Sequence, residues 1–97
     1  MNKNLNINNI ILSYLMDYKP EIIGLFGSYS RHENTKESDI DILVKFKETL
    51  SLLQLIRIEN ELSQKLGIKV DLITTGAIKN ERIKSNIEKD LKIIYQS

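Results

Sequence analysis

Two stretches of sequence decide the fold: residues 22–28, Ile-Ile-Gly-Leu-Phe-Gly-Ser, and residues 39–44, Asp-Ile-Asp-Ile-Leu-Val. The first is an apolar run closed by Gly27 and Ser28, a pattern typical of a buried strand that enters a tight turn. The second alternates acid and isoleucine, which predicts a strand with both carboxylates on one face and both isoleucines on the core side. The polar residues 29–38 between the two strands are expected to be exposed.

Apolar side chains at helical spacing mark one helix before these strands and two helices after them. The first helix, residues 7–18, ends before Pro20, and the second, residues 50–66, ends at Gly67, a residue favoured just past a helix C-terminus. The apolar residues assigned to the second helix are Leu52, Leu55, Ile56, Leu62 and Leu66. Those assigned to the last helix are Ile78, Ile83, Ile87, Leu91, Ile94 and Tyr95.

A third strand is predicted between the last two helices. Residues 69–73, Lys-Val-Asp-Leu-Ile, hold one acid, Asp71, among apolar side chains, and residues 74–76 form a turn after them. The expected order is therefore helix, strand, turn, strand, helix, strand, helix. This order predicts an α/β (α+β) fold in which a small mixed β-sheet is flanked by helices.

The composition predicts a single globular domain over residues 1–97. Apolar residues make up 41% of the chain and charged residues 28%, as in ordinary globular proteins, which disfavours disorder, collagen-like repeats and coiled coils. A chain of 97 residues can build only one modest core. Fourteen Lys and Arg against thirteen Asp and Glu leave a net charge of +1, so binding of nucleic acid by charge alone is not expected.

The chain contains no cysteine, which excludes a disulfide framework, a thiolate nucleophile and a cysteine metal site, and is compatible with a reducing cytosol. No apolar run approaches the roughly 18 residues that a membrane span needs. Residues 1–9 are polar and do not resemble a signal peptide. We therefore expect a cytoplasmic protein that makes no membrane contact.

Three acids, Asp39, Asp41 and Asp71, lie on the predicted strands or at their ends. Asp39 and Asp41 would be roughly 6 to 7 Å apart on one strand face, and at an effective dielectric constant near 20 they would repel each other by about 2 to 3 kcal/mol. A divalent cation would offset this repulsion, and hard oxygen ligands favour Mg²⁺ or Mn²⁺ over zinc. The alternative is that each acid is a solvated residue at a strand entry or on an open sheet face.

Gly27, Ser28 and Arg31 suggest a seat for phosphate. A glycine after a strand lets the backbone approach a ligand, Ser28 can offer its hydroxyl and N–H, and Arg31 could bind a phosphate with two hydrogen bonds. Neither a P-loop nor a dinucleotide-binding fingerprint is present. An ordinary strand-ending turn and a solvent-exposed arginine are the alternatives.

The spacing of these residues resembles a known family. Gly27-Ser28, then ten residues, then Asp39-Ile40-Asp41 is similar to the signature of the DNA polymerase β-like nucleotidyltransferases, and the short chain resembles the minimal nucleotidyltransferases (MNT). The likeness covers residues 10–95 and includes residues 53–66 and the segment Val-Asp-Leu-Ile at 70–73.

The resemblance implies the polymerase β-like fold and a chemistry. Asp39 and Asp41 would hold metal ions, two Mg²⁺ or Mn²⁺, that bridge a triphosphate, and Asp71 would bind the metal at the attacking hydroxyl or help to deprotonate that hydroxyl. Gly27 and Ser28 would cradle the β and γ phosphates, with Arg31 beside them. The reaction would be attack on the α-phosphorus of a nucleoside triphosphate, with ATP as the expected donor, and release of pyrophosphate.

The resemblance also implies a partner. Minimal members are similar to antitoxins of the HEPN/MNT type, in which the transferase places AMP on a tyrosine of a HEPN ribonuclease toxin. Tyr14, Tyr18 or the last helix would then be contact surfaces, in a homo- or hetero-oligomer. Two alternatives stay open: a non-catalytic module that neutralises its partner by occlusion, and one part of a two-component transferase that acts on a small molecule.

Overall fold

The computed structural model describes residues 3–27, 39–77 and 81–97. In these ranges the elements are helix α1 (Lys3–Leu15), the short 3-10 helix η1 (Met16–Tyr18), strands β1 (Pro20–Phe26) and β2 (Ile40–Phe46), helix α2 (Leu52–Leu66), strand β3 (Val70–Thr74), the 3-10 helix η2 (Thr75–Ala77), helix α3 (Glu81–Asp90) and strand β4 (Lys92–Gln96). The segment predicted to be exposed, residues 29–38, lies outside the described residues.

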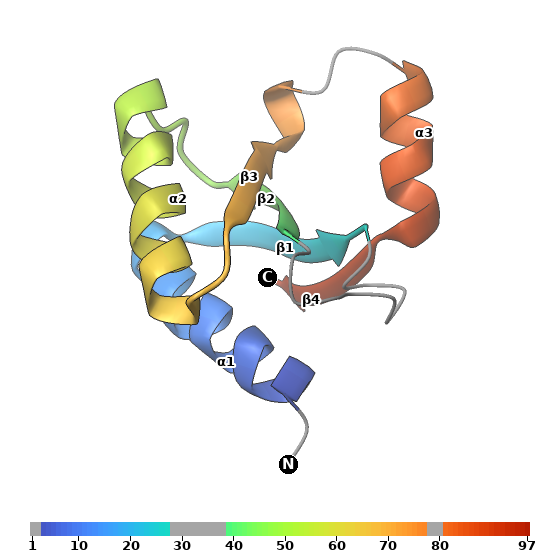
Figure 1. Ribbon diagram of the computed structural model, residues 1–97. Helices are drawn as coiled ribbons and strands as arrows, with labels where there is room; N and C mark the ends of the chain where they lie inside the picture. The colour runs from blue at the N-terminus through green and yellow to red at the C-terminus, as the bar shows by residue number, and fades with distance from the viewer. Residues whose placement is uncertain (1–2, 28–38, 78–80) are drawn as a thin grey trace.

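The strands form one mixed sheet in the order β3-β2-β1-β4. β1 runs antiparallel to both β2 and β4, whereas β3 runs parallel to β2. Figure 1 shows α1 and α2 on one side of this sheet and α3 on the other. The expectation of a small mixed sheet flanked by helices is confirmed.

The main core lies between the sheet and the pair α1 and α2. Its buried side chains are Ile11 and Leu15 of α1, Ile58 and Leu62 of α2, and Ile23, Leu25, Ile40, Ile42, Val44 and Val70 of the sheet. Ile40 and Ile42 are fully buried, so the isoleucines of the alternating segment do take the core side. Asp41 lies between them on the strand and therefore belongs to the opposite face, the face of α3.

Sequence signals define both ends of α2. Ser51 caps its N-terminus by accepting from the Gln54 N–H at 3.2 Å, while the Gln54 side chain accepts from the Ser51 N–H at 2.9 Å. Gly67 ends the helix with φ 69°, and its N–H donates to the Ser63 carbonyl. The predicted stop at Gly67 is therefore confirmed.

The predicted last helix is wrong over its final residues. α3 ends at Asp90, and residues 92–96 form β4, which pairs with the outer edge of β1. Ile94 and Tyr95 are β-branched and aromatic side chains that suit a strand as well as a helix, and β1 would otherwise present an unpaired edge. Pairing with a distant strand therefore decides the structure of this segment. Ile78 lies outside the described residues.

The buried stripe of α2 also differs from the predicted set. Leu52 is 72% exposed and Ile56 46% exposed, whereas Ile58 is fully buried with Leu62. Apolar residues occupy two adjacent stripes of this helix, and spacing alone does not decide which stripe faces the sheet.

Within the described residues, no helix is both long and apolar enough to cross a membrane.

Candidate functional site

The site begins with the pairing of β2 and β3. Asp41 and Asp71 are register partners in this parallel pair, so their side chains leave the sheet on the same face from strands about 4.8 Å apart. The Ile40 N–H donates to the Lys69 carbonyl at 2.9 Å where the two strands begin, and this bond sets the register. Two of the predicted acids, far apart in sequence, are thus placed side by side.

Asp39 lies next to this pair without joining it. It precedes β2, and the alternation of the strand directs it to the same side as Asp41. Its side chain is 40% exposed, and its Oδ2 lies 3.9 Å from Lys69 Nζ. Asp39 is therefore partly balanced by a lysine, at the limit of an ion pair.

Gly27 closes the site from β1. It follows Phe26, the register partner of Asp41, and has φ 77°. A Cβ at position 27 would collide with Oδ2 of Asp41, so only a glycine allows the end of β1 to lie against this carboxylate. In the structure Gly27 lies close to the Asp41 carboxylate, and the predicted approach of its backbone to a phosphate stays a prediction. Ser28 and Arg31, the other predicted phosphate-binding residues, lie outside the described residues.

The described acids match a magnesium ion in the kind of their donor atoms. Among the described residues, no group of three or more His, Cys, Asp or Glu side chains is arranged to hold a metal ion. Mg²⁺, however, is commonly bound by one or two carboxylates together with water and substrate phosphates, rather than by a cage of protein ligands. Asp41 and Asp71 provide such a pair of hard oxygen donors on one sheet face.

Two residues of α2 that the sequence analysis did not single out hold the outer edge of β3. The Val70 N–H donates to Ser63 Oγ at 2.9 Å, and the Leu72 N–H donates to Glu59 Oε2 at 2.9 Å. These bonds flank Asp71 on both sides. The signal in the sequence is a polar pair at i and i+4 on a helix followed by an edge strand, and this signal is too common to identify a site alone.

Tyr14 and Tyr18, proposed as contact surfaces, pack against each other, and Tyr14 also contacts α2. The Tyr14 hydroxyl donates to the Glu61 carboxylate, and the two tyrosine rings lie 5.7 Å apart between centroids. Burial, followed by the hydrogen bond with Glu61, raises the pKa of Tyr14 far above its ordinary value. Tyr14 therefore serves at least as a polar link between α1 and α2.

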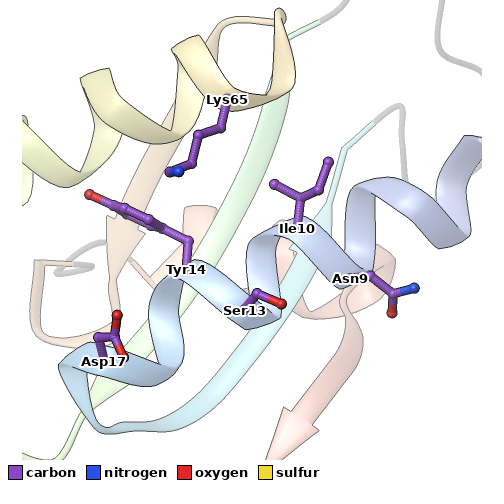
Figure 2. A pocket seen from close by; sticks show the side chains of 6 residues that line it. All are labelled: Asn9, Ile10, Ser13, Tyr14, Asp17 and Lys65. Atoms are coloured by element: carbon purple, nitrogen blue, oxygen red, sulfur yellow. The ribbon is translucent and has the colours of Figure 1, made fainter.

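A hollow of about 510 Å³ lies beside this link (Figure 2). It is lined by Asn9, Ile10, Ser13, Tyr14, Asp17 and Lys65. Lys65 reaches from α2 toward Tyr14, with Nζ 5.7 Å from the ring centroid. Because α1 and α2 cover the core side of the sheet, this hollow is separated from Asp41 and Asp71 by the sheet itself.

Another hollow, of about 320 Å³, lies on the same sheet face as the acids. Leu43, two residues after Asp41 on β2, forms part of its floor, with Ile87 and Leu91 from the α3 side and Lys45 and Lys84 among its polar lining. The acids therefore lie beside a partly apolar recess.

Comparisons with known proteins show which family this chain belongs to. The family model of polymerase beta nucleotidyltransferases matches residues 8–97. A protein of Methanocaldococcus jannaschii, provisionally named a protein adenylyltransferase, is 57% identical over 74 residues, which are 76% of each chain.

Two solved structures are similar in fold. A toxin-antitoxin structure with AMP-PNP has a TM-score of 0.83 and 28% identity, and the match covers 93% of this chain and 73% of that chain. A structure of a tri-AMPylated Shewanella oneidensis HEPN toxin in complex with its MNT antitoxin has a TM-score of 0.79 and 26% identity, with coverages of 97% and 73%.

Proposed function

Because the chain belongs to the polymerase β-like nucleotidyltransferases, in the MNT antitoxin branch, we propose that it transfers AMP from ATP to a tyrosine hydroxyl of a HEPN ribonuclease toxin. The observation that best supports this proposal is the pairing of Asp41 with Asp71 on one sheet face, with the Gly27 backbone against the Asp41 carboxylate. Two carboxylates beside the end of β1 support this proposal, because such transfers depend on fixed groups that neutralise developing charge.

The proposed site residues would have the following roles. Asp39, Asp41 and Asp71 would hold the metal site, and Gly27 would let the triphosphate approach the backbone at the end of β1. Ser28 and Arg31, which lie outside the described residues, are proposed as further phosphate-binding residues. Asp71 would bind the metal at the acceptor hydroxyl or help to take up the proton of that hydroxyl. A bound divalent cation would supply neutralisation of charge on the triphosphate oxygens.

The bond changes are those of a nucleotide transfer. The acceptor oxygen forms a bond to the α-phosphorus, the bond from the α-phosphorus to the bridging oxygen of the β-phosphate breaks, and pyrophosphate leaves. The hydroxyl proton passes to a carboxylate and then to solvent. Catalysis is mainly positioning and charge neutralisation, which a small sheet with a few carboxylates can provide.

The named partners of similar structures support a toxin acceptor. One such structure contains a HEPN toxin that carries AMP groups and is bound to an MNT antitoxin. The proposal for this chain is the same division of roles, with a HEPN toxin of the source organism as acceptor. The protein and its acceptor would then form a hetero-oligomer.

Intact mass spectrometry of that toxin tests the proposal. Incubation with this protein, Mg²⁺ and ATP is expected to add one or more AMP masses, and Asp41→Asn is expected to abolish the gain. Asp17→Asn is the matched control, because Asp17 is an exposed acid on the opposite side of the sheet. Full transfer by Asp41→Asn would contradict the assignment of the site, and a stable complex without any mass gain would favour neutralisation by occlusion.

A further inference from the structure

The outer edge of β3 is held by side chains instead of a neighbouring strand. β3 is the terminal strand of the sheet, and the N–H groups of Val70 and Leu72 point away from β2. Such N–H groups normally bond to water or to another strand. Here they donate to Ser63 and Glu59 of α2, so the helix takes the place of a fifth strand at this edge.

The spacing of the two acceptors on α2 matches the spacing of the two N–H donors on β3. Four residues of helix from Glu59 to Ser63 rise about 6 Å, and two residues of strand from Val70 to Leu72 extend about 6.6 Å. Because the helix runs opposite to the strand, the later helix residue bonds the earlier strand residue. Two anchors at matched spacing fix both the height and the tilt of β3 relative to α2.

Ser63 is itself held in a defined orientation. Its hydroxyl donates to the Glu59 carbonyl at 2.7 Å and accepts from the Val70 N–H at 2.9 Å. The hydroxyl hydrogen of Ser63 therefore points to the Glu59 carbonyl of the same helix, and a lone pair of its oxygen points to the Val70 N–H of β3. An alanine would lose both bonds, whereas a threonine can keep them.

These contacts bear directly on the acid pair. Asp71 lies between the two anchored residues, and its carboxylate must face Asp41 from the neighbouring strand. We propose that Ser63 and Glu59 are positioning residues for Asp71, which hold β3 so that Asp71 and Asp41 present one binding surface to the metal and the acceptor. The inference rests on the proposed function and adds two residues of α2 to the site.

Ser63→Ala, Ser63→Thr and Glu59→Gln test this role, with Ser51→Ala as the matched control. Ser51 caps the same helix and does not contact β3, so Ser51→Ala weakens α2 without touching the anchors. The readouts are amide hydrogen exchange at Val70 and Leu72, binding of Mn²⁺ alone followed by electron paramagnetic resonance, and AMP transfer as a function of Mn²⁺ concentration.

Ser63→Ala is expected to speed exchange at Val70 and to weaken Mn²⁺ binding by up to about tenfold, the lower end of the cost of losing a direct partner of a metal ligand, because Ser63 acts on Asp71 through the neighbouring Val70. Ser63→Thr and Glu59→Gln, which keep an acceptor oxygen, should stay close to the wild type. Ser51→Ala should lower thermal stability and leave Mn²⁺ binding unchanged.

Two outcomes overturn the proposal in distinguishable ways. If the wild type transfers AMP and Ser63→Ala binds Mn²⁺ as Ser51→Ala does, the anchors do not position Asp71, and the proposed function stands. If the wild type neither binds Mn²⁺ nor transfers AMP, the proposed function itself fails and the positioning role falls with it.

Discussion

At the scale of single residues, the site depends on the lack of a side chain at Gly27, which leaves room for the Asp41 carboxylate. The alternating segment Asp39-Ile40-Asp41 was sufficient to predict that the isoleucines face the core. The approach of Gly27 to the Asp41 carboxylate was not predictable in detail, because it depends on the antiparallel register of two strands. Local alternation sets the face, and tertiary pairing sets the contact.

Gly27→Ala is expected to lower the free energy of unfolding by about 1 to 3 kcal/mol. The alanine would have to adopt a left-handed backbone conformation, and its Cβ would collide with the Asp41 carboxylate. Gly67→Ala separates the two effects, since Gly67 also has a left-handed backbone (φ 69°) but a Cβ at this position would meet no atom within 4 Å. Urea denaturation of both variants should show the larger loss for Gly27→Ala, together with loss of AMP transfer only in that variant. Equal losses would show that the contact with Asp41 contributes nothing.

The anchors Ser63 and Glu59 mark the limit of prediction at this scale. The sequence places both on a helix, but nothing local shows that they bond to a strand edge. Their partners, Val70 and Leu72, come to them only because Gly67 reverses the chain and the buried stripe of α2 settles on Ile58 and Leu62. Side-chain contacts between elements follow from packing, which spacing alone does not reveal.

At the scale of elements, the strongest local signals were the most reliable. Gly67 ended α2 as predicted, whereas residues 92–96 formed a strand where a helix was expected. The difference has a physical cause: a glycine in the left-handed region acts on its own backbone, but a short apolar segment takes the structure that its partner offers. The free edge of β1 supplied that partner.

The hydrogen bond from Tyr14 of α1 to Glu61 of α2 predicts that the free energy of unfolding depends on pH in the alkaline range. Burial and the hydrogen bond with Glu61 raise the pKa of Tyr14 above the ordinary tyrosine value of about 10. Its contribution to stability is therefore complete below about pH 10 and is lost as the pH rises from there through the folded-state pKa. We expect the free energy of unfolding to fall above about pH 10, and to fall less steeply in Tyr14→Phe.

Denaturant unfolding at a series of pH values checks this expectation, with Tyr95→Phe as the control because Tyr95 lies on β4, away from the Tyr14–Glu61 link. An identical alkaline slope in the wild type and in Tyr14→Phe would show that Tyr14 is not responsible.

At the scale of the whole molecule, the sheet separates two surfaces. α1 and α2 cover the core face, and the acids open on the other face, beside α3 and the recess that includes Leu43. The fold class was predictable from the order of elements, but the strand order β3-β2-β1-β4 was not, because parallel pairing of β2 with β3 joins segments separated by a whole helix. That pairing creates the site.

The most direct test of the central claim is a crystal structure of the protein with Mn²⁺ and a non-hydrolysable ATP analogue, in which anomalous scattering locates the metal. We expect a manganese peak in contact with the carboxylates of Asp41 and Asp71, with the triphosphate against the backbone of Gly27. Manganese or triphosphate bound in the hollow between α1 and α2, with Asp41 and Asp71 making no contact to either, would contradict it.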